Sequence, residues 1–243
     1  MRWVVAIWLL SGCQLALGLR PIGDTATDAA GTDAAPAVPI DIVQFNAGPL
    51  PSAATSIPVV MPNDQLAGDL NVVFIAHGDT FTGVASVSDS NGNSYKAQIM
   101  GSHQVAYYAA NIAGGPNTVT VTFNSSTTYP DVRVLEYQGI AAANPLDDYH
   151  STDGNGLMMT SGAVMTTHAY DLLVAGNSVG GHTSDPDPLY TQRLETNPNG
   201  NIAEDRIVTN TGTYDATAIQ TATTDDSWTI SLLAFKGAAD APP

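Results

Sequence analysis

The feature that most constrains the fold is a recurrence of short runs in which apolar and polar residues alternate. Residues 118–123 read TVTVTF, so a strand would place all three apolar side chains on one face. Runs of this kind, rich in Val, Ile, Thr and Tyr, recur along residues 40–237, and turn residues punctuate them. No convincing helical stretch follows the first dozen residues. The pattern therefore predicts an all-β chain.

The number of these runs favours one kind of all-β architecture. Many short strands at regular spacing indicate a two-sheet antiparallel β-sandwich, jelly-roll-like, with an immunoglobulin-like sandwich as the alternative. Asn91-Gly92 between two runs predicts a tight hairpin, and residues 114–117 and 197–200 are further breaks. No internal repeat of fixed period is evident. The expected strands span residues 40–45, 70–77, 84–89, 94–100, 104–110, 118–124, 132–139, 163–168, 171–177, 190–195, 201–209, 214–220 and 227–235.

The N-terminus has the pattern expected of an export signal. Arg2 supplies a positive charge, and an apolar run over residues 3–10 is too short to span a bilayer, which needs about 20 apolar residues. Residues 10–13 read LSGC and resemble the lipobox of bacterial lipoproteins, in which the chain is cut before a lipidated cysteine. Cys13 is the only cysteine of the chain. The resemblance implies a signal peptide over residues 1–12 and a membrane anchor on Cys13, because several acyl chains anchor stably.

Composition divides the rest of the chain. Residues 13–39 hold scattered Asp, Ala, Thr and Pro without large apolar groups, which predicts a disordered acidic linker after the lipidated cysteine. A β-sandwich domain is expected over residues 40–237 and a flexible tail over 238–243. Gln14 is not the Asp that retains some lipoproteins at the inner membrane, so we expect an exported cell-envelope protein, with the outer membrane favoured over the inner.

The charge balance excludes one class of partner. The chain has 7 Lys+Arg against 23 Asp+Glu and a net charge of -16. Nucleic-acid binding rests on neutralisation of phosphates by Lys and Arg, so this partner is excluded. The balance suits a soluble extracellular surface and cation binding.

Several sequence segments show a second resemblance. Residues 87–95, 111–123, 133–139 and 202–206 are similar to a β-sandwich module of secreted bacterial proteins that has no established activity. Such modules accompany adhesins and polysaccharide-degrading enzymes. The resemblance implies location and fold, and it provides no catalytic residues.

One motif matches a nucleophile pattern. Residues 176–180 read GNSVG, which fits G-x-S-x-G with Ser178 as the nucleophile. That motif works at a strand–turn–helix elbow, whereas the residues that follow, GHTSDP, cannot begin a helix. No His follows His182, although the hydrolase order needs one after the acid. We therefore expect a strand end leading into a Gly-rich loop, and no catalytic residue is assigned.

Oxygen ligands for a cation gather in three places. Residues 89–93 read DSNGN and begin like a calcium loop, but Ser94 and Met100 stand where an EF-hand needs Gly and an acidic ligand, so a turn is favoured. No cofactor is expected, with a structural Ca²⁺ ion as the alternative. The five histidines form no pair with zinc-ligand spacing. The candidate calcium ligands are Asp147, Asp148 and Asp153 in one loop, and Asp185 and Asp187 in another.

Aromatic and charged strand residues are the remaining candidates. Tyr108, Tyr190 and Trp228 could present rings to a sugar, although filling the core is the usual role of such rings. Two carboxylates could hydrolyse a glycosidic bond, but pairing with arginine across strands is favoured. The charged residues in question are Arg133, Glu136, Glu204, Asp205 and Arg206.

Three functions remain open at this level. The favoured one is a non-catalytic lipoprotein whose sandwich binds a glycan or a protein partner, because no acid, base or nucleophile is marked by spacing. The alternatives are a polysaccharide-active hydrolase or lyase on a jelly-roll fold, and a purely structural envelope protein.

Overall fold

The described part of the chain consists of antiparallel strands and the turns between them. The computed structural model describes residues 38–78, 83–221 and 226–238, and within them no helix occurs, so none could span a membrane. The expected leader, Cys13 and nearly all of the expected linker lie outside the described residues, as does the end of the expected tail. The all-β prediction is confirmed.

The strands form five sheets among the described residues. One inner sheet has the order β1-β8-β3-β6-β5 and the other has the order β14-β15-β12-β18-β9. Outer sheets are β2-β7-β4 on one side, and β10-β17-β13 with the pair β11-β16 on the other. The strands are β1 (Asp41–Ala47), β2 (Ala53–Val60), β3 (Leu70–Ala76), β4 (Val84–Asp89), β5 (Lys96–Met100), β6 (Gln104–Ala110), β7 (Thr118–Thr128), β8 (Asp131–Gln138), β9 (Leu146–Asn155), β10 (Met158–Thr160), β11 (Val164–Met165), β12 (Asp171–Val179), β13 (Thr183–Asp185), β14 (Thr191–Glu195), β15 (Ile202–Val208), β16 (Thr213–Tyr214), β17 (Thr217–Gln220) and β18 (Ser227–Lys236).

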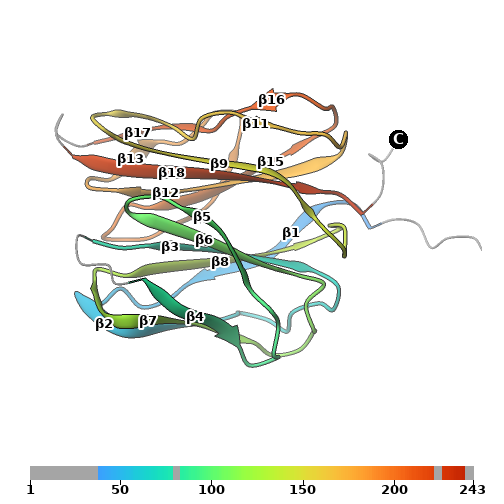
Figure 1. The fold of residues 1–243 in the computed structure, drawn as a ribbon, viewed down its shortest axis with the longest axis horizontal. Helices are drawn as coiled ribbons and strands as arrows, with labels where there is room; N and C mark the ends of the chain where they lie inside the picture. Colours follow the sequence, from blue (N-terminus) through green and yellow to red (C-terminus); the bar gives the residue numbers. More distant parts are fainter. Residues whose placement is uncertain (1–37, 79–82, 222–225, 239–243) are drawn as a thin grey trace, which may run out of the picture. The chain divides into compact units, whose positions relative to one another are not determined.

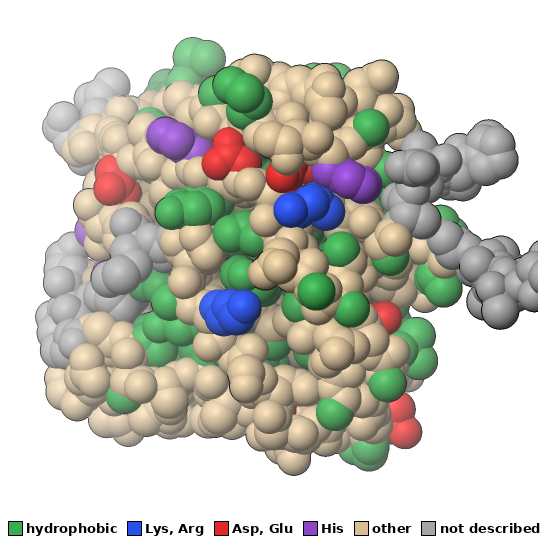
Figure 2. All heavy atoms as spheres, turned by 45° about the vertical axis from the view of Figure 1, so that its right-hand side comes forward, with side chains coloured by type: hydrophobic (Ala, Val, Ile, Leu, Met, Phe, Trp, Pro, Cys, Tyr) green, Lys and Arg blue, Asp and Glu red, His purple; other side chains and the backbone are tan. Residues whose placement is uncertain are grey.

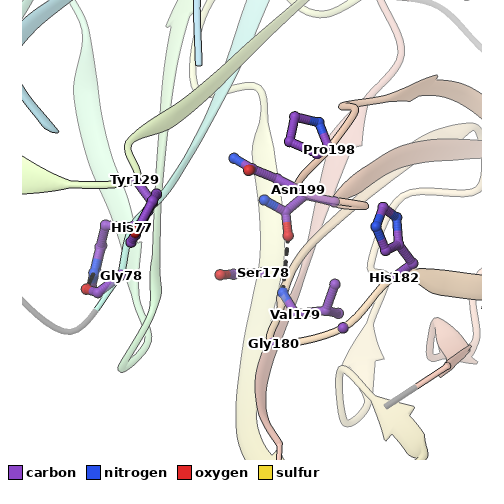
Figure 3. Close-up of a pocket in the computed structure, with 11 residues that line it drawn as sticks. His77, Gly78, Tyr129, Ser178, Val179, Gly180, His182, Pro198 and Asn199 are labelled. Carbon is purple, nitrogen blue, oxygen red and sulfur yellow. Dashed lines mark hydrogen bonds between the residues drawn. The ribbon is translucent and has the colours of Figure 1, made fainter. Parts of the chain in front are cut away.

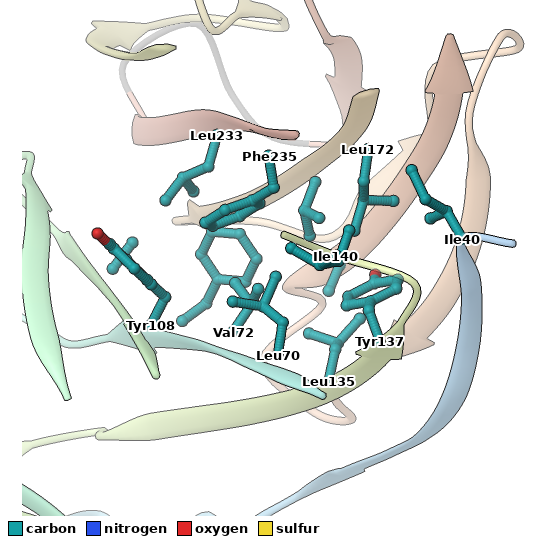
Figure 4. Close-up of a cluster of buried hydrophobic side chains, with 14 of the residues drawn as sticks. Ile40, Leu70, Val72, Tyr108, Leu135, Tyr137, Ile140, Leu172, Leu233 and Phe235 are labelled. Atoms are coloured by element: carbon teal, nitrogen blue, oxygen red, sulfur yellow. The ribbon is translucent and has the colours of Figure 1, made fainter. Parts of the chain in front are cut away.

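These sheets stack in four layers (Figure 1), with the two inner sheets facing each other and an outer sheet covering each of them. A separate apolar core fills each of the three spaces between layers. The central core, between the inner sheets, holds among others Leu70, Val72, Leu135, Leu172, Leu233 and Phe235 (Figure 4). The other two cores lie under the outer sheets and include Ile57, Val73, Val121 and Val134 on one side and Leu173, Ala216, Ile230 and Leu232 on the other.

The layering explains the most apolar segments of the sequence. In β3, Leu70 and Val72 point into the central core while Val73 and Ile75 point into the core under β2-β7-β4. A strand that is buried on both faces has no polar face, so its sequence is a continuous apolar run rather than an alternating one. Strand β12 has the same position in the other inner sheet and is likewise buried almost throughout.

The connectivity repeats. In β1–β8 (the first repeat, residues 41–138), the first strand pairs with the last, the second with the seventh and the third with the sixth. In β9–β18 (the second repeat, residues 146–236), β9 pairs with β18, β10 with β17 and β12 with β15, while β11 and β16 form an added pair. Pairing that wraps inward from both ends is typical of a jelly roll. The chain is therefore a tandem of two jelly-roll sandwiches.

The repetition extends to individual side chains of the central core. The register places residues of β3 opposite those of β8, and residues of β12 opposite those of β18, in the same pattern. The equivalent pairs are Leu70–Tyr137 and Val72–Leu135 in the first repeat, and Leu172–Phe235 and Val174–Leu233 in the second. The next position breaks the likeness, because Phe74 of one repeat is replaced by Gly176 in the other. The large ring and the glycine contact each other across the core.

The predicted jelly-roll sandwich is thus confirmed, and the structure extends it from two sheets to five. The repeat carries no fixed sequence period because the added strands and unequal loops shift the spacing of equivalent residues. The prediction for Asn91-Gly92 needs a correction. These residues form a turn, with φ of 76° at Gly92, but β4 and β5 enter different sheets and make no hairpin. The turn is a crossover between layers, which a local pattern cannot distinguish from a hairpin.

Candidate functional site

A buried arginine connects the two inner sheets. The Arg133 side chain, on β8, is wholly buried and lies 3.4 Å from the carboxylate of Asp131. Its guanidinium donates to Gln104 Oε1 at 2.8 Å and, across the central core, to the carbonyls of Asn177 (2.7 Å) and Ile202. An unpaired buried cation is costly, and these acceptors distribute its charge over both repeats.

Asp131 performs the complementary role. Its Oδ2 accepts hydrogen bonds from Thr196 Oγ1 (2.5 Å), Asn201 Nδ2 (2.7 Å) and Asn199 Nδ2 (3.2 Å). All three donors belong to the turn between β14 and β15, in the second repeat. A carboxylate of the first repeat therefore determines the position of this turn. Charge-assisted hydrogen bonds of this length are among the strong ones in proteins.

These contacts shape a pocket between the two repeats, with a volume of about 310 Å³. Figure 3 shows two walls that face each other: His77, Gly78 and Tyr129 on one side, and the β12 end with the β14–β15 turn on the other. The Ser178 hydroxyl lies between them. The described lining residues are His77, Gly78, Tyr129, Ser178, Val179, Gly180, Gly181, His182, Pro198, Asn199 and Asn201. None of these carries a carboxylate, Lys or Arg.

Tyr129 is the exposed aromatic residue of this pocket. It lies in the turn between β7 and β8 with φ of 45° and 62% of its surface exposed. A bulky residue at positive φ is an outlier, and Tyr129 also precedes a proline, which further restricts its backbone. Its N–H donates to Ser52 at 2.9 Å, and a methyl group at Gly78 would come within 3.3 Å of its Cδ2. The turn thus presents the ring at the edge of the pocket in a strained conformation, a pattern often found at functional sites.

The opposite wall is locked by polar contacts. Asn201 donates through Nδ2 to Asp131 and accepts at Oδ1 from the N–H of Val179 at 2.9 Å, so both ends of its amide are used. Gly200 has φ of 69°, and a side chain there would meet His182 at 2.6 Å. Only glycine has both the freedom to adopt this positive φ and no side chain to clash with His182. The turn can therefore pack directly against His182.

His77 is buried at the end of β3, and its Nδ1 lies 2.9 Å from the carbonyl of Gly78. Burial lowers the pKa of the imidazole, and the nearby His103 lowers it further, against the opposing effect of the Gly78 carbonyl. Since a carbonyl only accepts, Nδ1 carries the proton in this contact. The pocket therefore has a neutral imidazole on this wall near pH 7.

The structure places the G-x-S-x-G motif in strand β12 rather than at an elbow. Ser178 is buried near the end of that strand, and residues 180–183 lead into β13 without a helix. His77 and His182 line the same pocket as Ser178, a grouping that the sequence did not indicate. Among the described lining residues, no Asp or Glu accompanies this serine and these histidines as the third member of a Ser–His–acid triad.

The candidate calcium ligands of the first group are spread along one strand. Asp147, Asp148 and Asp153 were expected in a loop, but they lie on β9, an edge strand paired with β18. Each carboxylate accepts hydrogen bonds from a different neighbour. Asp147 accepts from the N–H and the hydroxyl of Thr167, and Asp148 accepts from the N–H of Met165. Asp153 accepts from the N–H and the hydroxyl of Ser102 and from the hydroxyl of Thr229. These donors hold the pKa of Asp147 and of Asp153 low against the raising effect of burial.

The second group is also divided. Asp185 is exposed on β13, whereas Asp187 is buried and accepts from Leu189 N–H and from the N–H and hydroxyl of Thr217, at 2.8–2.9 Å. Asp89 has the corresponding role in the first repeat, with five donors from Asn91, Asn93, Tyr95 and Asn117. Throughout the described ranges, no group of three His, Cys, Asp or Glu side chains is placed to hold a metal ion.

The three aromatic candidates need a correction. Tyr108, Tyr190 and Trp228 are only 6%, 8% and 6% exposed. Tyr108 packs edge-on against Phe235, with ring centroids 5.4 Å apart, and the other two rings lie in the core under β10-β17-β13. They fill cores because both inner sheets are covered on both faces, a fact that the sequence pattern did not reveal.

The charged strand residues divide into separate contacts. Asp205 forms a two-point ion pair with Arg193, at 2.9 and 3.0 Å, and Arg206 lies 5.4 Å from the ring centroid of Tyr214. Glu136 accepts from Gln44 Nε2 and from Leu66 N–H. Glu204 is buried, and burial, followed by the charge of Asp187, raises its pKa to about 8 against the lowering effect of a hydrogen bond with the Asp187 backbone. The expected pairing of Arg133 and Arg206 with these acids is wrong, because Arg133 lies beside Asp131, Arg206 lies over the Tyr214 ring, and Asp205 pairs with Arg193 instead.

Comparison with known proteins adds no relative to this picture: no protein-family model, no curated protein and no solved structure matches the chain.

Proposed function

We propose that this protein is a membrane-anchored lipoprotein of the cell envelope whose tandem jelly roll is a non-catalytic glycan-binding module. The single observation that carries the binding part is the pocket between the repeats, edged by the exposed ring of Tyr129 and lined by hydroxyl, amide and imidazole groups. Sugars offer apolar ring faces and many hydroxyls, so they are recognised by an aromatic platform together with neutral polar groups. A pocket of about 310 Å³ also favours a small molecule over a protein surface.

The lipid anchor in this proposal rests on the sequence of residues 10–13 and on the single Cys13. The surface agrees with an exposed location, since charge is sparse and cationic side chains occupy isolated places on the face drawn in Figure 2. Mass spectrometry of the mature N-terminus tests the anchor. Acylated Cys13 as the first residue is the expected result, and a chain that still starts at Met1, or an unmodified Cys13, would overturn it.

A glycan array probed with the full chain tests the binding part. Retention of a subset of glycans without release of shorter products is the expected result. Released oligosaccharide would instead support the second candidate, a hydrolase or lyase, for which the one favourable observation is that Ser178 shares its pocket with two histidines. If the protein neither binds nor cleaves any glycan on the array, a purely structural role in the envelope is the remaining candidate.

A further inference from the structure

We infer that the pocket between the repeats selects an uncharged sugar unit at the end of a glycan, stacks one face of that sugar on Tyr129 and rejects acidic sugars. This inference rests on the proposed glycan-binding function and adds the ligand class to it.

The described lining of the pocket has no Lys or Arg to balance the charge of an acidic sugar. Burial keeps His77 neutral near pH 7 by lowering its pKa. An anionic ligand would lose hydration on entering and gain no Lys or Arg partner in return, which is unfavourable. The net charge of -16 adds repulsion at long range.

The glycines that line the pocket do not form an anion-binding nest. A nest requires successive backbone N–H groups that point at the ligand. Here Gly78 N–H donates to Thr128 at 2.9 Å, Gly180 N–H to Ser227 at 3.0 Å and Gly181 N–H to Gln220 Oε1 at 3.3 Å. These three glycine N–H groups, from both walls of the pocket, are therefore committed to the fold.

Asn199 and Ser178 are lining residues whose polar groups can still bind a ligand. Asn199 gives one Nδ2 hydrogen to Asp131, so its Oδ1 acceptor and its second Nδ2 hydrogen remain, and a group that both accepts and donates suits a sugar hydroxyl. The Ser178 hydroxyl, between the two walls in Figure 3, can donate or accept. Asn201 contributes to the wall only, because both ends of its amide are occupied.

The volume of the pocket suits a single sugar unit. A volume of about 310 Å³ lies at the small end of the range for ligand pockets, about 300–1,000 Å³. One pyranose ring with bridging water fits this volume, whereas a run of several sugars needs an extended groove. The two walls come from different repeats, so the sugar would contact both sandwiches at once.

The test uses matched probes and three variants of the full chain. Calorimetric titration compares neutral methyl hexosides with the same sugars oxidised at C6 to uronates, together with the glycans retained on the array. Tyr129→Ala should weaken binding of the neutral sugar at least about tenfold, while Tyr129→Phe, which keeps the ring, should bind within about twofold of the parent. Tyr149→Ala removes another exposed ring, on β9 and outside the pocket lining, and should change nothing.

The outcomes separate the inference from the function on which it rests. If no glycan of any kind binds, the proposed function fails. If glycans bind but uronates bind as well as neutral sugars, or Tyr129→Ala binds like the parent at an unchanged melting temperature, the function stands and this inference is overturned. Selective binding of neutral sugars, lost only in Tyr129→Ala, supports it.

Discussion

Asp131 of the first repeat accepts a 2.7 Å hydrogen bond from Asn201 of the second repeat, 70 residues further along the chain. The same carboxylate oxygen holds Thr196 and Asn199. One buried acid thus positions the wall of a pocket that belongs to the other sandwich. The stability of the fold and the shape of the candidate site depend on a shared set of contacts.

Asp131→Ala should be strongly destabilising. The substitution leaves the buried Arg133 without its carboxylate and three donors without their acceptor, and removing one partner of a buried ion pair costs about 3–5 kcal/mol. The free energy of unfolding from urea denaturation measures the loss. Asp131→Asn keeps the shape and one acceptor oxygen, so a smaller loss is expected. A change under about 1 kcal/mol in the Ala variant would contradict the role given to this acid.

Gly176→Ala tests the contact between the repeats. A methyl group there would lie 2.6 Å from Cγ of Phe74. Both residues face the central core between the inner sheets, where close packing leaves little room for either to move. We expect a loss of about 1–3 kcal/mol from overpacking, seen as a lower melting temperature. Phe74→Leu alone should also destabilise, because it leaves a cavity. The double variant should be more stable than the sum of the two losses predicts, and simple additivity would show that the two sites do not couple.

Stability should fall as the pH rises from about 5 to 8.5. Asp69 and Asp171 lie at equivalent positions of the repeats, and burial raises the pKa of each to about 7. Carboxylate neighbours add to the rise, Glu136 beside Asp69 and Asp147 beside Asp171, against the lowering effect of His168. A carboxyl group whose pKa is higher in the folded than in the unfolded protein stabilises the fold most at pH values below its unfolded pKa of 3.8. This contribution is lost as the pH rises through the folded pKa of about 7. Melting temperatures across this range measure the effect, and a flat profile would contradict it.

Glu204→Gln isolates the most alkaline part of this profile. Burial, followed by the charges of Asp187 and Asp205, raises the pKa of Glu204 to about 8, while a contact from the Asp187 backbone opposes the rise. Its unfolded value is 4.5, so its contribution is lost as the pH approaches and passes 8. The neutral amide cannot ionise, so the variant should lose less stability between pH 7 and 9 than the parent. Equal losses in both proteins would assign that part of the profile to other groups.

Chelation should leave the melting temperature unchanged. The carboxylates of Asp89, Asp147 and Asp153 accept hydrogen bonds from N–H and O–H donors, which occupy the oxygens that Ca²⁺ would need. Melting with and without a chelator, followed by addition of excess Ca²⁺, measures this. A drop on chelation that Ca²⁺ reverses would establish the structural calcium site that the sequence offered as an alternative.

The strands that the sequence missed show where local patterns stop. Strand β9 reads LDDYHSTDGN, with three Asp, a Gly and an Asn, all of low strand propensity. It forms because the edge of β18 offers backbone partners along most of β9, with one shift of register between Ala234 and Phe235. Strand β2, which contains Pro58, pairs with β7 at the edge of its sheet, where a missing N–H is tolerated. In both, the partner strand outweighs the propensity.

The sequence by itself determined the all-β class and most strands of the two inner sheets, because alternation and long apolar runs record how many faces of a strand are buried. Only the tertiary structure decided that the strands form two jelly rolls in four layers, and that Tyr108, Tyr190 and Trp228 are covered. It alone brought together His77, Tyr129, Ser178 and Asn199. These residues come from four separate segments, and a pocket depends on contacts between such segments, which no local spacing records.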